Sequence, residues 1–75
     1  MDIIEILAQN LRLARQSKKL TQEALADLSG LSSRYIGAIE RANVGISITV
    51  LAQLAEALDV EPGDLLRAPS PKKTK

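Results

Sequence analysis

The chain has 75 residues, a formal net charge of +1 at pH 7, a single aromatic residue and neither cysteine nor histidine. A chain of this length can bury one small core, which must here be aliphatic, and such domains are only marginally stable unless they pack efficiently or oligomerise. Without cysteine or histidine there is no disulfide framework, no common zinc site and no usual general base. We therefore expect no catalytic residue, no metal site, no cofactor and no enzymatic activity.

Three helices are predicted in the first half of the chain. Each follows a residue whose side chain can accept hydrogen bonds from the free backbone N–H groups at a helix N-terminus. The predicted ranges are 3–17 after Asp2, 22–29 after Thr21 and 33–41 after Ser32. An apolar stripe on the first helix should lie in the core. It consists of Ile3, Leu7, Leu11 and Ala14.

Two further helices are predicted in the second half. Ser47 is the expected N-cap of a helix over residues 48–58, and Pro62 favours the first position of a short fifth helix through Leu66. The apolar side of the fourth helix should join the core through Ile48, Leu51, Leu54, Ala55 and Leu58. The chain is thus predicted to be an all-α, compact five-helix domain over residues 1–67, followed by a disordered basic tail over residues 68–75.

The small net charge hides two regions of opposite sign. Residues 11–41 hold six basic and three acidic side chains, whereas residues 42–67 hold one basic and four acidic side chains. The first region therefore carries a net charge of +3 and the second a net charge of −3. Because a cationic surface attracts phosphates and an acidic one repels them, we expect nucleic acid to approach the first region.

The stretch from Thr21 to Arg41 has the outline of a helix-turn-helix, since two short amphipathic runs are separated by Gly30 and a brief connection. Its apolar residues fall where two steeply crossing helices would share one small core. The residues predicted to remain outside are Gln22, Ser32, Ser33, Arg34, Gly37, Ala38 and Arg41. Short hydroxyls, an amide and arginines suit a DNA groove, because they bond base edges and phosphates without bulk.

The sequence LTQEALADLSGLSSRYIGAIERA resembles the helix-turn-helix of the Cro and lambda-repressor-like (XRE-type) family, and the similarity covers about residues 7–66. The resemblance implies a five-helix DNA-binding domain in which the third helix reads the major groove of double-stranded DNA. Members with this architecture act as homodimers, whose two recognition helices enter successive major grooves about 34 Å apart.

The resemblance, together with the exposed positions, assigns two sets of DNA-contacting residues. Base contacts are predicted for Ser33, Arg34 and Ala38, and phosphate contacts for Thr21, Gln22, Ser32, Gly37, Arg41 and Asn43. Arg34 can place two donors on a guanine, worth about 1 to 3 kcal/mol of discrimination. Two alternatives stay open: Arg34 only neutralises a phosphate, or Gln22 is an ordinary exposed amide in the first turn of its helix.

The resemblance also implies a structural brace, and the chain departs from the family pattern at two places. The family pairs an arginine of the first helix with the glutamate near the end of the recognition helix, which here are Arg15 and Glu40. Where the family commonly has glycine before Leu-Thr-Gln, this chain has Lys19, and a positive φ there would cost on the order of 1 kcal/mol. In the loop over residues 42–46, Ala42 stands where the family often has glycine after Glu-Arg, and the basic residues that usually follow are missing.

Aliphatic residues left over by the core assignment predict a dimer interface in the acidic half of the chain. Its expected members are Val44, Ile46, Val50 and Leu66. The function favoured by all these features is a sequence-specific transcriptional regulator, of a type that includes restriction-modification controller proteins. The alternative is an antitoxin-like or protein-binding module on the same fold. We expect a cytoplasmic protein without a membrane segment or a small-molecule effector.

Overall fold

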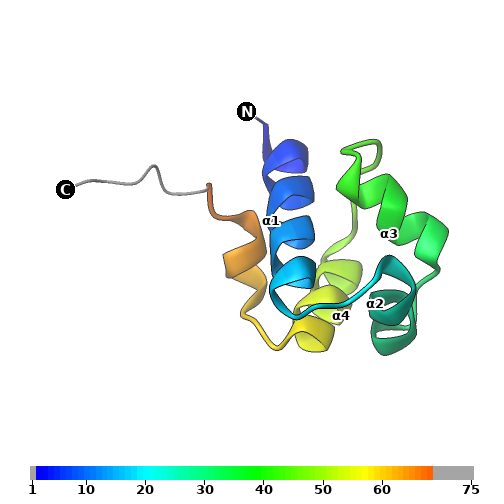
Figure 1. Ribbon diagram of the computed structural model, residues 1–75. Helices are drawn as coiled ribbons and strands as arrows, with labels where there is room; N and C mark the ends of the chain where they lie inside the picture. The colour runs from blue at the N-terminus through cyan, green and yellow to red at the C-terminus, as the bar shows by residue number, and fades with distance from the viewer. Residues whose placement is uncertain (1, 69–75) are drawn as a thin grey trace.

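The computed structural model describes residues 2–68, and all regular structure in this range is helical (Figure 1). Four α-helices are followed by one short 3₁₀ helix: α1 (Ile3–Ser17), α2 (Gln22–Ser29), α3 (Ser33–Glu40), α4 (Ile48–Leu58) and η1 (Pro62–Leu66). No helix in this range is long and apolar enough to cross a membrane. The all-α prediction is confirmed for the described residues, whereas the predicted tail lies outside them from residue 69 onward.

The four α-helices begin where the capping side chains predicted them to begin. In each case the side-chain oxygen of the N-cap accepts a hydrogen bond from the backbone N–H three residues later, at 2.9 to 3.1 Å. The four N-caps are Asp2, Thr21, Ser32 and Ser47. Each bond satisfies one donor that the helix itself leaves free, so these four residues set the helix boundaries.

The short fifth helix is present over the predicted residues 62–66, but it is a 3₁₀ helix, so the domain has four α-helices and not five. A segment of five residues is too short for a series of i→i−4 hydrogen bonds, and short pieces commonly adopt the tighter 3₁₀ form. The free carbonyls at its end are instead bound by α1. The Asn10 side-chain Nδ2 donates to the carbonyl oxygens of Leu65 at 3.0 Å and of Arg67 at 2.8 Å.

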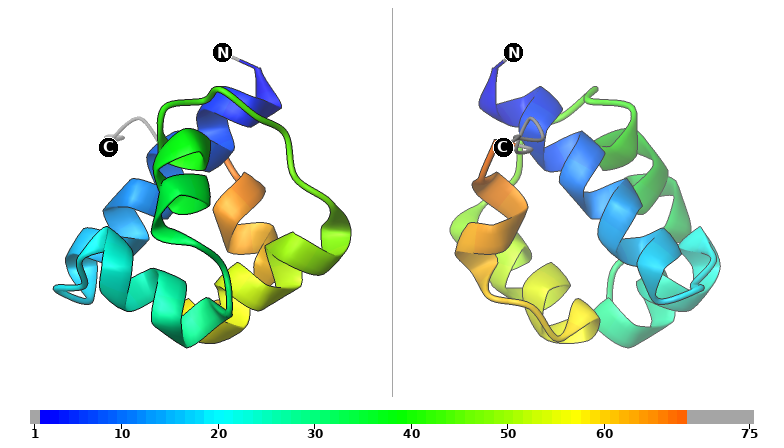
Figure 2. Two further views of the ribbon diagram at one scale, coloured as in Figure 1. Left: turned by 90° about the vertical axis from the view of Figure 1, so that its right-hand side faces the viewer. Right: turned by 60° about the vertical axis from the view of Figure 1, so that its left-hand side comes forward.

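The helix α1 runs through the middle of the domain, with α3 on one side and η1 on the other (Figure 1). The helices α2 and α4 pack against each other, and α4 also contacts η1. Figure 2 shows α2 and α3 together on one face, at left, and η1 beside α1, at right. Every helix contributes to one core, whose fully buried large side chains are Leu11, Leu25, Ile36, Ile39, Leu54, Leu58 and Leu65.

Two residues assigned to the core by their spacing are in fact exposed. Ile3 is 53% exposed and Ile48 is 84% exposed. Each is the first residue of its helix, where the chain has not yet reached the layer of neighbouring helices. Helical periodicity identifies the face of a side chain but not whether another element covers that end of the helix, so the core assignment of Ile3 and Ile48 is corrected.

Three helices are followed by residues other than glycine in the left-handed conformation. The φ angles are 60° at Lys19, 60° at Ala42 and 58° at Asp59, whereas Gly30 adopts 79° after α2. The positive φ considered for Lys19 is thus confirmed. The helix α3 ends at Glu40, one residue earlier than predicted, and Ala42 makes the turn that a glycine would make without strain.

Replacing Ala42 with glycine is expected to raise the free energy of unfolding by about 0.5 to 1 kcal/mol. The substitution removes a left-handed strain of about 1 to 2 kcal/mol, part of which is offset by the greater freedom of glycine in the unfolded chain. Thermal unfolding followed by circular dichroism measures the effect. Ala52→Gly, at an exposed site inside α4, is the matched control and should lower stability by about 1 kcal/mol. A loss of stability in both variants would contradict the prediction.

Candidate DNA-binding surface

The helices α2 and α3 form a helix-turn-helix with a short connection. Gly30 ends α2 with a positive φ, and Ser32 caps α3 two residues later, so the chain reverses within residues 30–32. The left view of Figure 2 presents this pair of helices toward the reader, with α3 above α2. Apolar residues from both helices meet beneath this face, among them Leu25 and Ile36, which have no exposed surface.

The N-terminal turn of α3 holds Ser33 and Arg34, two of the three residues predicted to contact bases, and Ala38 lies in the next turn. Arg34 is exposed, whereas Ser33 and Ala38 are half-buried. The hydroxyl oxygen of Ser32 accepts from the backbone N–H of Tyr35 at 3.0 Å, which leaves the hydroxyl hydrogen free to donate. Arg34 is therefore the longest exposed donor at the end of α3 that would enter a groove first.

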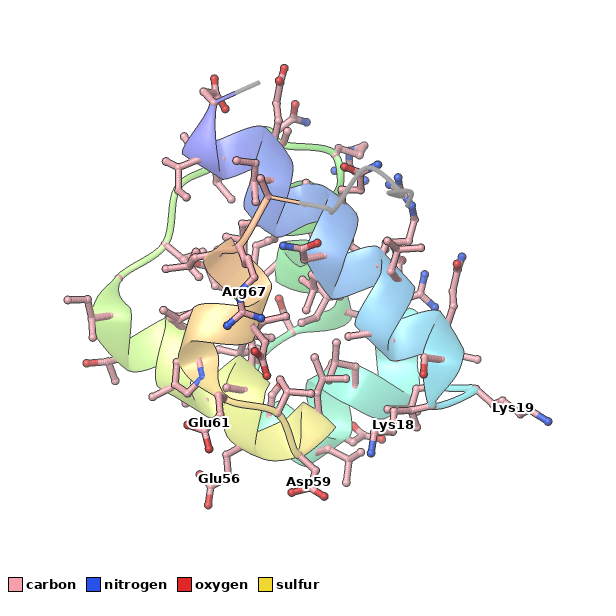
Figure 3. All side chains as sticks on the ribbon, turned by 90° about the vertical axis from the view of Figure 1, so that its left-hand side faces the viewer. Lys18, Lys19, Glu56, Asp59, Glu61 and Arg67 are labelled. Carbon is pink, nitrogen blue, oxygen red and sulfur yellow. The ribbon has the colours of Figure 1, made fainter. Side chains whose placement is uncertain are left out.

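Acidic side chains gather on the side of the molecule that faces away from α3. Figure 3 shows this side, where Glu56, Asp59 and Glu61 lie around the end of α4 and the start of η1. Lys18 and Lys19 follow the end of α1 and are seen from the same side, Lys18 nearer to Asp59 than Lys19 is. The acidic group therefore faces away from α3, whereas Lys18 and Lys19 of the basic region are seen on the same side as the acidic group.

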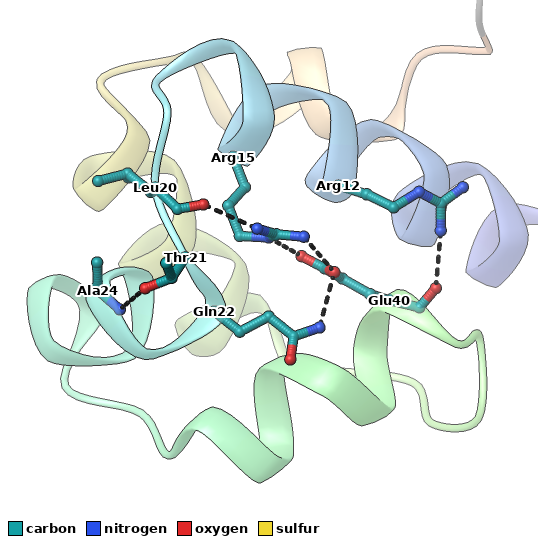
Figure 4. Close-up of polar contacts among 7 residues, drawn as sticks. All are labelled: Arg12, Arg15, Leu20, Thr21, Gln22, Ala24 and Glu40. Carbon is teal, nitrogen blue, oxygen red and sulfur yellow. Dashed lines mark hydrogen bonds and ion pairs between the residues drawn. The ribbon is translucent and has the colours of Figure 1, made fainter.

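The predicted pair Arg15 and Glu40 forms a two-pronged contact between α1 and α3 (Figure 4). Arg15 Nε lies 2.6 Å from Glu40 Oε2, and Arg15 Nη2 lies 3.1 Å from Glu40 Oε1. The side chains are 13% and 4% exposed, so the pair is largely withdrawn from water. Two parallel hydrogen bonds between charged groups fix both the distance and the relative orientation of the two helices.

Further hydrogen bonds connect this pair to the chain around it. Arg15 Nη1 donates to the carbonyl oxygen of Leu20 at 2.8 Å, in the connection between α1 and α2. Arg12 Nη1 donates to the carbonyl oxygen of Glu40 at 3.4 Å, near the C-terminal end of α3. Arg15 therefore connects α1, the α1–α2 connection and α3. Arg12 places a positive charge near the C-terminal end of α3, where the helix dipole favours it.

Gln22 is tied to the same carboxylate and is not a free surface amide. Its Nε2 donates to Glu40 Oε1 at 3.0 Å, and the residue is half-buried in the first turn of α2. The other predicted phosphate-contacting residues Thr21, Ser32, Arg41 and Asn43 are exposed. The bond to Glu40 uses one of the two N–H groups of the amide, which leaves the second available to a ligand.

Gly37 does not lie on the outer surface as predicted, because the structure buries it. A Cβ atom built on Gly37 would lie 3.1 Å from Arg41 Nη1, 3.6 Å from Gln22 Oε1 and 3.8 Å from Gln22 Nε2. The ends of these two side chains therefore cover the backbone of Gly37. The close approach that a helical glycine permits is made here by the side chains of Gln22 and Arg41.

The predicted dimer residues Val44, Ile46, Val50 and Leu66 are half-buried and pack against the core of their own chain. Ile46 and Leu66 also line an apolar groove of about 230 Å³ between the start of α1, the start of α4 and the end of η1. The exposed Ile3 and Ile48 lie on the same groove. The sequence analysis did not identify Ile3 and Ile48 as surface residues, because their helical spacing assigned them to the core.

Comparisons with known proteins agree with this geometry. A helix-turn-helix family model matches residues 11–65. The control protein C.SmaI of Serratia marcescens is 46% identical over 66 residues, which cover 88% of this chain and 79% of the relative. The structure of the restriction-modification controller protein C.AhdI from Aeromonas hydrophila matches with a TM-score of 0.80 at 44% identity, over 83% of this chain and 94% of that one. The hypothetical transcription factor NHTF from Neisseria matches with a TM-score of 0.88 at 38% identity, over 91% of this chain and 78% of that one.

Proposed function

The chain belongs to the helix-turn-helix family, and we propose that it is a DNA-binding transcriptional regulator that acts as a homodimer on a pseudo-palindromic operator. The observation that carries this proposal is the N-terminal turn of α3, where the exposed Arg34 and the adjacent Ser33 stand at the leading end of the second helix of the motif. A helix presented in this way enters a major groove, and an arginine there can pair with the O6 and N7 atoms of guanine.

Phosphate contacts on both sides of the groove would fix the position of α3. Thr21, Gln22 and Ser32 lie at the N-terminal ends of α2 and α3, where free N–H groups and the helix dipole favour anions. Asn43 would contact the DNA backbone beyond the other end of α3, and Arg41, whose guanidinium reaches back along α3 toward Gln22, would contact it on the Gln22 side. The acidic side chains around the end of α4 face away from α3, so the proposed orientation keeps them away from DNA.

Dimerisation follows from the size of the domain and from the apolar groove at the start of α4. A single copy would bury only a small core and place one recognition helix on DNA, whereas a two-fold dimer would place two. We assign the contact to the groove lined by Ile46 and Leu66, extended by Val44 and Val50. A two-fold interface uses the same patch on both copies, and this groove adjoins an exposed apolar side chain that a second groove can accept.

The names of two relatives support a controller role. C.SmaI is a control protein, and C.AhdI is a restriction-modification controller protein. We propose that this chain likewise controls an operon that contains its own gene. Because two copies must assemble before both half-sites are filled, occupancy of the operator would rise steeply with the concentration of the protein.

Replacing Arg34 with alanine tests the proposal. Fluorescence anisotropy on duplexes tiled across the DNA upstream of the gene should identify a preferred duplex, and Arg34→Ala should weaken binding to it by about 1 to 3 kcal/mol per half-site. Binding to the other duplexes should fall much less, because a base contact discriminates between sequences. Arg67→Ala is the matched control: it removes the same charge from an exposed arginine on the far side of the domain, paired with Asp64.

One result would count against this function, and another against the role assigned to Arg34. Equal and feeble binding of the parent protein to every upstream duplex would refute autoregulation and favour a protein partner, as in an antitoxin-like module. An equal loss of affinity in Arg34→Ala on preferred and other duplexes would reduce Arg34 to a phosphate contact.

A further inference from the structure

Gly37 occupies a place in α3 where glycine is not the natural choice. It lies inside a helix of eight residues, where glycine costs about 1 kcal/mol relative to alanine, and its φ angle is not among the positive ones. Apart from the backbone of α3 itself, the three nearest atoms that an added Cβ would meet are all ends of the Gln22 and Arg41 side chains. Helix packing therefore does not require glycine at this position.

The absence of a side chain at residue 37 leaves room for the guanidinium group of Arg41. Arg41 follows Gly37 by one helical turn, and its Nη1 atom would lie only 3.1 Å from a Cβ at residue 37. The two Gln22 atoms would lie at 3.6 and 3.8 Å, which is ordinary contact. The missing side chain thus lets the guanidinium of Arg41 fold back over residue 37, which the amide of Gln22 also covers.

The two side chains brought together in this way have complementary properties for binding an anion. The Gln22 amide is oriented by Glu40, which accepts one N–H and leaves the other free. The ion pairs among residues 2–68 are Arg15 with Glu40 and Arg67 with Asp64, so no carboxylate in this range neutralises Arg41. An oriented amide donor beside an unneutralised guanidinium suits a phosphate oxygen.

We infer that Gly37 is a positioning residue for DNA binding, which holds the guanidinium of Arg41 beside Gln22 so that the two side chains bind one backbone phosphate together. The inference rests on the proposed function, since it assigns a role within that binding surface. It replaces the direct phosphate contact predicted for Gly37 with an indirect one. Replacing Gly37 with alanine should then raise the stability of the domain and lower its affinity for DNA.

The test compares the parent protein with Gly37→Ala, Arg41→Ala and the double variant. The probe is a fluorescein-labelled duplex of random sequence about 25 base pairs long, enough for two half-sites one helical turn apart. A random duplex is suitable because phosphate contacts carry no sequence information, and binding is measured by anisotropy over a range of salt concentrations. Thermal unfolding of each variant is measured in parallel.

Gly37→Ala should raise the midpoint of thermal unfolding by about 4 to 8 °C, because alanine favours the helix and only the flexible end of Arg41 must move. Its affinity for the duplex should fall about five- to tenfold. The slope of log K against log salt concentration should become less steep by about 0.9 for each phosphate that the variant no longer binds. In the Arg41→Ala background, Gly37→Ala should change neither the affinity nor the slope.

Three outcomes would overturn the inference. The first is unchanged affinity in Gly37→Ala together with increased stability, since the glycine would then be irrelevant to DNA binding. The second is an equal loss of affinity with and without Arg41, since residue 37 would then act by another route. The third is a parent protein that binds no duplex at low salt. This result would refute the proposed function as well, and the measurement on the parent protein alone is enough to show it.

Discussion

Replacing Glu40 with alanine is expected to lower the free energy of unfolding by about 3 to 5 kcal/mol, because it leaves the largely buried Arg15 without its counter-charge. The same substitution deprives the Gln22 amide of its acceptor. A domain of this size has a total stability near the lower end of about 5 to 15 kcal/mol, so the variant should be partly unfolded at room temperature. Urea unfolding followed by circular dichroism measures the loss.

A double variant separates the loss of an ion pair from the exposure of an unpaired charge. Arg15→Met combined with Glu40→Leu replaces both charges with apolar side chains of similar length, a change that is often close to neutral in buried pairs. It should therefore recover most of the stability lost in Glu40→Ala. A loss below about 1 kcal/mol in Glu40→Ala would contradict the prediction, and so would a double variant that is no more stable than the single one.

The same variants show whether the brace also serves DNA binding. The carboxylate of Glu40 holds α1 against α3 through Arg15 and orients the amide of Gln22 at the proposed phosphate site. The Arg15→Met, Glu40→Leu protein should then be folded yet bind a random duplex more weakly than the parent, because its Gln22 is no longer oriented. A structural brace alone would leave the affinity unchanged.

The parts of the fold that sequence predicted best depend on local chemistry. Asp2, Thr21, Ser32 and Ser47 each bond a backbone N–H three residues away, so the helix starts are encoded within four residues of sequence. The contact between Arg15 and Glu40 joins residues far apart in the chain. No local rule predicts such a contact, and it was anticipated only through resemblance to a known family.

The errors concern properties that arise only when elements are assembled. Ile3 and Ile48 have the spacing of core residues, but no neighbouring helix covers the ends of the helices that they begin. Gly37 is on the outer side of α3 by its spacing, yet side chains from α2 and from the end of α3 bury it. Periodicity gives an angle around one helix axis, whereas burial depends on what other elements place there.

Ile48 is the residue through which we expect the proposed dimer to be most easily disrupted, and Ile48→Lys should raise the dimer dissociation constant at least 100-fold. Burying an isoleucine contributes about 1.5 to 3 kcal/mol, and a two-fold interface counts each substitution twice. The groove of about 230 Å³ beside Ile48 has room for such a side chain from a second copy, since an apolar cavity of about 150 Å³ already holds benzene. Sedimentation equilibrium measures the change.

The control for Ile48→Lys must add the same charge at another exposed aliphatic residue. Leu28→Lys meets this requirement, because Leu28 is 61% exposed on α2 and is not among the residues that line the groove. If Leu28→Lys remains dimeric while Ile48→Lys is monomeric, the groove is the interface. The monomeric variant should still bind a single half-site but lose the steep dependence of operator occupancy on concentration, because each recognition helix would then bind alone. Dimerisation unaffected by Ile48→Lys would place the interface elsewhere and would leave the exposure of Ile48 unexplained.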